Sequence, residues 1–80
     1  MGVNDMRMAF NSVLDGRGTA TKALLSYKPQ HDIEWQILQF RGTWADGTAF
    51  DVKSEPLRPG SDVVAASRQT AQRMLDEAGK

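Results

Sequence analysis

The sequence predicts a small α+β domain in which helices cover one face of a three-stranded antiparallel sheet. Three observations support this prediction: a hairpin whose register can be read, another extended segment upstream of it, and an amphipathic stretch near the C-terminal end. The expected order is helix, three strands, helix, with both helices on one face of the sheet. The 80 residues form one domain, near the lower size at which a chain can bury its own core.

The first segment, NDMRMAFNSVLDG, fits a helix over residues 5–15. Asn4 can cap its start, and Gly16 can end it. A strand that turns at residues 15–18 is the alternative, and it would give the order β-β-β-β-α. At helical spacing, one side of the segment carries Met6, Phe10, Val13 and Leu14.

The next segment, TKALLSYKP, reads as a strand over residues 21–28 that ends at Pro29. The residues from Lys28 to Asp32 then form a turn. Because side chains alternate between the two faces of a strand, the adjacent Leu24 and Leu25 give each face an apolar residue.

The hairpin spans a strand at residues 33–44 and another at 48–55, joined by the sequence WADGTAF. A two-residue Asp46-Gly47 turn would mix apolar and polar residues on one face. A three-residue loop, with Gly47 in the left-handed conformation, sorts them instead. It pairs Arg41 with Asp51, so opposite charges face each other. It also leaves a core face of Leu38, Phe40, Trp44, Phe50 and Val52.

The C-terminal segment predicts a helix over residues 62–78 that covers this core face. Pro59-Gly60 breaks the chain before it, Ser61 can cap it, and Gly79 ends it. Its apolar stripe is narrow, with small residues in the middle, so the helix can lie close to its neighbours. The stripe consists of Val63, Val64, Ser67, Ala71, Met74, Leu75 and Ala78.

Composition excludes several classes of function. Ten basic residues balance ten acidic ones, so no global positive field attracts nucleic acid. The lack of cysteine excludes disulfides and thiolate metal sites and fits a reducing cytoplasm. No apolar run is long enough to span a membrane, and the start lacks a secretory signal. We therefore expect a cytoplasmic protein without a membrane partner.

No residue pattern indicates an active site. His31 is the only histidine, and no cysteine or second histidine can share a zinc ion with it. The serines lie in no nucleophile pattern. The glycines of DGRGT have neither a Walker nor a GxGxxG frame. We expect no enzymatic activity, no metal site and no cofactor.

One apolar set does not fit the core face. Ile33, Trp35 and Ile37 alternate on odd positions, whereas the core residues of the same strand lie on even ones. A β-bulge near residues 36–37 would return Trp35 to the core. Otherwise the three residues stand on the helix-free face, joined by Tyr27 or Leu25 from the neighbouring strand and by Arg41.

An exposed apolar patch of this kind usually marks a contact surface. The predicted function is therefore a protein-interaction module that binds a protein partner, or itself, through Tyr27, Ile33, Trp35, Ile37 and Arg41. An accessory or regulatory protein, such as those of phages and other mobile elements, fits this description.

The alternative is a nucleic-acid-binding module. The layout resembles that of double-stranded RNA-binding domains, which implies contact with phosphates through a basic cluster at the start of the last helix. This sequence has Ser61, Asp62 and Val63 there, and Arg68 is the first cation. The remaining form of this alternative is a surface of Trp35 and Tyr27 that stacks on single strands, with Lys22, Lys28 and Arg41 nearby.

Overall fold

The chain folds as two helices on one face of a three-stranded antiparallel sheet, as predicted. The computed structural model describes residues 2–79, apart from the side chain of Gln30. In chain order the elements are α1 (Val3–Leu14), β1 (Gly18–Gln30), β2 (Ile33–Trp44), β3 (Ala49–Lys53) and α2 (Val63–Ala78). The first segment is a helix, so the alternative order with four strands is wrong. The sheet order is β1-β2-β3, which leaves β1 at an edge.

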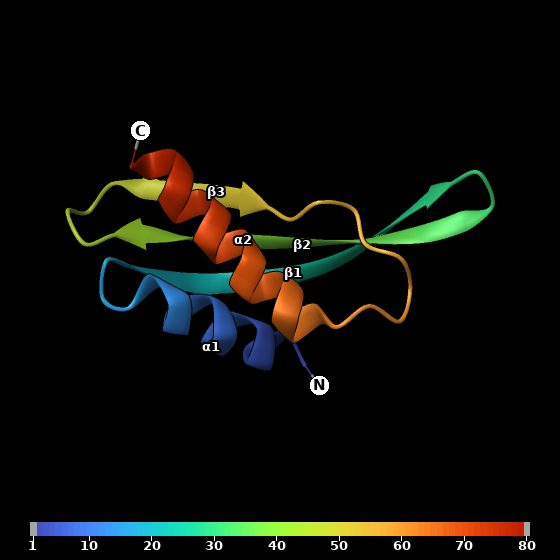
Figure 1. The fold of residues 1–80 in the computed structure, drawn as a ribbon, viewed down its shortest axis with the longest axis horizontal. Coiled ribbons are helices and arrows are strands. Elements are labelled where there is room, and N and C mark those ends of the chain that lie inside the picture. The colour runs from blue at the N-terminus through green and yellow to red at the C-terminus, as the bar shows by residue number, and fades with distance from the viewer. Residues whose placement is uncertain (1, 80) are drawn as a thin grey trace.

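Figure 1 shows how far the hairpin of β1 and β2 extends. The helix α2 crosses in front of the sheet, and α1 lies alongside β1. The far end of the hairpin continues beyond both helices and is strongly twisted there. None of the helices described is long and apolar enough to cross a membrane.

The helix caps differ from those predicted. The cap of α1 is Gly2, not Asn4, and the Gly2 N–H donates to the Asp5 carboxylate at 3.0 Å. The cap of α2 is Asp62, not Ser61; its carboxylate accepts the N–H groups of Val64 and Ala65, both at 3.1 Å. A carboxylate at a helix N-terminus also interacts favourably with the helix dipole.

The hairpin of β2 and β3 has the predicted register. Phe40 faces Val52, Gly42 faces Phe50 and Arg41 faces Asp51. In the loop, the Trp44 N–H donates to the Thr48 carbonyl at 2.8 Å, the Gly47 N–H donates to the Trp44 carbonyl at 2.9 Å, and Gly47 has a φ of 91°. The three-residue loop with a left-handed glycine is therefore confirmed.

The hairpin of β1 and β2 is longer than predicted. Its strand β1 starts at Gly18 and continues through Pro29, and the turn contains only His31 and Asp32, whose φ angles are 52° and 65°. Proline is tolerated here because β1 is an edge strand, where one side of the backbone has no strand to pair with.

The bulge that could have returned Trp35 to the core lies elsewhere. Pairing is continuous from Lys22 with Arg41 to the turn, and the register shifts only between Ala20 and Lys22. Next to this shift, the amide group of Asn11 on α1 bonds the backbone of Ala20. Its nitrogen donates to the carbonyl at 3.0 Å, and its oxygen accepts the N–H at 2.6 Å. Asn11 thus takes the place of a neighbouring strand at this point of the edge.

The core lies between the sheet and the two helices. The rings of Phe10 on α1 and Phe40 on β2 stack with centroids 4.2 Å apart, and both residues are fully buried. The partly buried Trp44, Phe50 and Val52 pack against this centre, as the predicted core face required. The remaining buried apolar residues are Met6, Ala9, Leu14, Ala20, Ala23, Leu38, Ala66, Ala71 and Met74.

Candidate functional site

The helix-free side of the sheet, here called the open face, carries most of the predicted patch. Side chains alternate along β2, so Ile33, Trp35 and Ile37 lie on the side opposite Leu38 and Phe40. Ile33 is 39% exposed, and Trp35 and Ile37 are half-buried. Neither Trp35 nor Ile37 belongs to the core or packs against it.

The register decides which residues of β1 join this patch. Leu24 faces Gln39 and Ser26 faces Ile37, so both lie on the open face. Tyr27 faces Gln36 and therefore lies on the other side of the hairpin, 55% exposed. The structure does not bring Tyr27 together with Trp35.

The other predicted neighbour, Leu25, faces Leu38 on the helix-covered side. The register of β1 with β2 could have been predicted from the sequence if the turn at His31 and Asp32 had been identified as a two-residue turn. Two residues with positive φ, His31 and Asp32, close the hairpin, and a two-residue turn fixes every cross-strand pair behind it.

Trp35 is partly covered by a cation. The guanidinium of Arg58 lies 5.7 Å from the centroid of the Trp35 ring, within the range of a cation–π contact. The segment after β3 holds Arg58 in place, because Leu57 forms two backbone hydrogen bonds of 2.8 Å with Gln36. The indole is therefore held in one environment on the surface.

The open face is strongly basic, although the whole chain is neutral. Among residues 2–79, the register and the Trp35 contact place five cations there against a single carboxylate, that of Asp51. The balancing carboxylates lie in the helices, in the turns and on the other side of the sheet. The charge balance of the whole sequence does not reveal this asymmetry, because the five cations come from four separate segments. They are Lys22, Lys28, Arg41, Lys53 and Arg58.

The Asp51 carboxylate is held by its neighbours in β2. Gln39 donates to it at 2.7 Å, and the Arg41 guanidinium lies 3.2 Å away. The Gln39 hydrogen bond and, to a smaller extent, the charge of Arg41 lower the pKa of Asp51 below its ordinary value. In the hairpin loop, hydrogen bonds from the Thr48 hydroxyl and N–H lower the pKa of Asp46 in the same direction.

These two carboxyl groups predict a loss of stability in acid. A pKa that is lower in the folded state means that the unfolded chain binds protons first, so the contribution is complete above the ordinary value of 3.8. It is lost as the pH falls through the lowered pKa. We expect the urea midpoint to decrease below pH 3.8, and to decrease less in an Asp46→Asn/Asp51→Asn variant. An identical acid dependence in both proteins would contradict this assignment.

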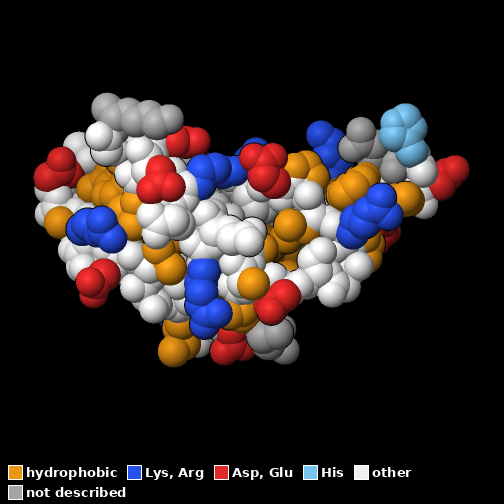
Figure 2. Space-filling model, in the orientation of Figure 1, with side chains coloured by type: hydrophobic (Ala, Val, Ile, Leu, Met, Phe, Trp, Pro, Cys, Tyr) orange, Lys and Arg blue, Asp and Glu red, His pale blue; other side chains and the backbone are white. Residues whose placement is uncertain are grey.

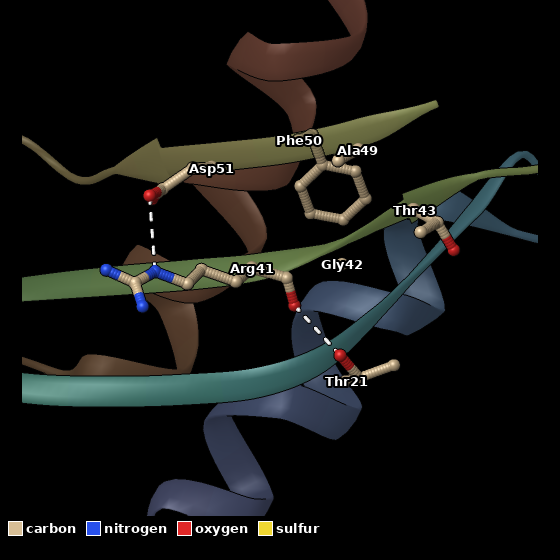
Figure 3. Close-up of a pocket in the computed structure, with 7 residues that line it drawn as sticks. All are labelled: Thr21, Arg41, Gly42, Thr43, Ala49, Phe50 and Asp51. Carbon is tan, nitrogen blue, oxygen red and sulfur yellow. Dashed lines mark hydrogen bonds and ion pairs between the residues drawn. The ribbon is translucent and has the colours of Figure 1, made fainter. Parts of the chain in front are cut away.

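A shallow hollow lies on the open face at Gly42. It has a volume of about 440 Å³, and Figure 3 shows Arg41 and Asp51 on one side and Thr43 and Ala49 on the other. Its only ionisable groups, Arg41 and Asp51, are paired with each other. The Thr21 hydroxyl donates to the Arg41 carbonyl at 3.4 Å, so the described lining presents no acid–base pair that is free of other partners.

The remaining candidate groups lie apart from the open face and from one another. His31 is exposed in the tight turn at the end of the hairpin. Within residues 2–79, no three side chains of histidine, cysteine, aspartate or glutamate are grouped so that they could hold a metal ion. Figure 2 shows acidic and basic side chains interspersed over the helix-covered side.

Comparison with known proteins does not assign a function to this site. No protein-family model, curated protein or solved structure matches the chain. The site is therefore interpreted from its own residues.

Proposed function

We propose that this chain is a non-enzymatic protein-binding module that uses the open face around Trp35. The observation that supports the proposal is the apolar row of Ile33, Trp35 and Ile37, which lies outside the core on a face that neither helix covers. Small monomers rarely keep such a row exposed unless it contacts another molecule.

The residue types suit a binding anchor. Tryptophan and arginine are enriched among the residues that dominate binding energy at interfaces, and Trp35 lies on the same face as Arg41 and against Arg58. Leu24 and Ile37 extend the apolar area around the indole. Because the hairpin pairing holds these side chains in place, binding would require little ordering of the chain.

A second candidate function is binding of single-stranded nucleic acid on the same face. The observation that favours it is the basic character of the open face, since lysine and arginine neutralise phosphates and Trp35 can stack on a base. For either function, the cysteine-free composition fits action in the cytoplasm as an accessory protein.

The test is affinity capture from cells of the organism that encodes the chain, with wild-type protein and Trp35→Ala as baits. We expect the variant to bind a specific partner about thirtyfold more weakly and to capture correspondingly less of it, because truncation of an interface anchor costs about 2 kcal/mol or more in binding. Quantitative mass spectrometry measures the captured protein, and nuclease treatment separates protein from nucleic-acid partners. Circular dichroism shows whether Trp35→Ala keeps the fold.

The matched control is Tyr27→Ala, which removes another large aromatic from the same hairpin on its other side. The proposal requires that Tyr27→Ala still captures what the wild type captures. Equal capture by all three proteins, or equal loss in both variants, would rule out the open face as the binding surface. Nuclease-sensitive capture would favour the second candidate.

A further inference from the structure

We infer that the partner of the open face is an acidic protein segment, and not a second copy of this chain. This inference rests on the proposed function and adds the chemistry of the partner. Its basis is charge complementarity: of the five cations around the apolar row, only Arg41 has a carboxylate partner on the open face, Asp51.

Four of these five cations have no ion-pair partner within the described chain. The three ion pairs found there are those of Arg41 with Asp51 and of Arg73 with Glu55 and Glu77. Lys22, Lys28, Lys53 and Arg58 of the open face take part in none of them. A partner with carboxylates would supply the missing counter-charges and would be attracted over a distance of about 10 Å at 0.1 M salt.

A second copy of the chain does not fit this surface. Two open faces pressed together would place cations against cations, and like charges across an interface cost several kcal/mol. Pairing through the free edge of β1 is also disfavoured, because lysines and proline on an edge strand oppose strand addition by an identical strand. That edge carries Lys22, Lys28 and Pro29, and Asn11 already occupies it at Ala20.

The apolar part of the surface favours protein over nucleic acid. Binding of single strands relies on successive bases stacked on aromatic rings, and the open face presents one aromatic ring, Trp35, because Tyr27 lies on the other side. The other apolar residues are aliphatic: Leu24, Ile33 and Ile37. These pack with apolar side chains and give a phosphate backbone no hydrogen bond.

The spacing along β1 defines the shape of the partner segment. Lys22 and Lys28 lie six residues apart on the same face of the strand, which corresponds to about 20 Å. Leu24 and Ser26 lie between them on that face. A matching segment is extended, with carboxylates near both ends and apolar residues in the middle.

The test uses defined peptides and the fluorescence of Trp35 in a Trp44→Phe background. The probe is the peptide Glu-Glu-Leu-Thr-Val-Thr-Leu-Glu-Glu, with two controls: the same peptide with lysine for glutamate, and an oligothymidylate of similar length. We expect the acidic peptide alone to bind. We expect its affinity to fall about tenfold or more between about 50 and 500 mM salt, because salt screens exposed charges. A Lys22→Glu/Lys28→Glu variant should lose about tenfold at low salt.

Each other outcome overturns the inference. Equal binding of both peptides would mean a purely apolar surface, and tighter binding of the oligothymidylate would mean a nucleic-acid surface. Failure of all probes, or a Trp35-dependent dimer in sedimentation velocity, would also reject an acidic partner. In these cases the proposed function still stands if cellular capture depends on Trp35, and it falls separately if capture does not.

Discussion

Replacement of Phe40 by alanine should lower the free energy of unfolding by about 3–5 kcal/mol. Phe40 is fully buried at the centre of the core, and its ring stacks on that of Phe10 with centroids 4.2 Å apart. The truncation removes the contacts of a whole ring and leaves a cavity that the rigid hairpin cannot close. A domain of 80 residues has a total stability of about 4–12 kcal/mol, so this loss removes at least about a quarter of the stability and unfolds the variant at the lower end of that range.

Urea denaturation, followed by circular dichroism, measures this effect. A Phe40→Leu variant keeps most of the buried volume and should lose less, which gives a measurable value if the alanine variant does not fold. The matched control is Tyr27→Ala on the same hairpin, 55% exposed, which should change stability by no more than about 0.5 kcal/mol. Equal losses at the two positions would contradict the assignment of the core.

Replacement of Gly42 by alanine should destabilise the sheet by about 3 kcal/mol or more, beyond the usual range for an added methyl group. A Cβ at this position would overlap the carbonyl oxygen of Thr19 and would lie 2.7 Å from the Cα of Ala20. Both obstacles are backbone atoms of β1, so no rotation of a side chain can relieve the clash. The backbones of β1 and β2 must therefore move apart at this position.

The control for this substitution is Gly79→Ala at the end of α2. A Cβ there would meet its nearest neighbour at 3.5 Å, and the φ of −81° suits any residue. We expect a change of no more than about 0.5 kcal/mol. Hydrogen exchange should show that Gly42→Ala speeds exchange in β1 and β2 near the bulge. A stability equal to that of the wild type would mean that the two strands do not approach as closely as described.

The order of elements and one register could be predicted from the sequence because they depend on local patterns. The loop around Gly47 sorts apolar from polar residues in only one of its two forms, and that form fixes the pairs of Phe40 with Val52 and of Arg41 with Asp51. The apolar side of the first helix likewise follows from its 3.6-residue period, with Met6, Phe10 and Leu14 fully buried.

The caps were harder to predict because several residues near each helix start could serve. Asn4 and Ser61 have suitable side chains, but the helices start at positions that use Gly2 with Asp5 and Asp62 instead. The Ser61 hydroxyl donates to the Arg58 carbonyl at 2.6 Å and is therefore engaged in the loop before the helix. Small energy differences decide such choices.

The amino-acid sequence by itself determined the α+β class, the register of the second hairpin, and the presence of more apolar residues on β2 than one covered face can hold. These are consequences of periods and turns within short stretches of chain. Only the tertiary structure decided that the bulge lies at Ala20 and Lys22, that Tyr27 and Trp35 lie on opposite sides, and that Arg58 covers the indole. The same is true of the basic open face. The physical reason is that strand pairing brings together residues from separate segments. The register between two strands then sets every cross-strand pair, and a shift of one residue moves each side chain to the other face.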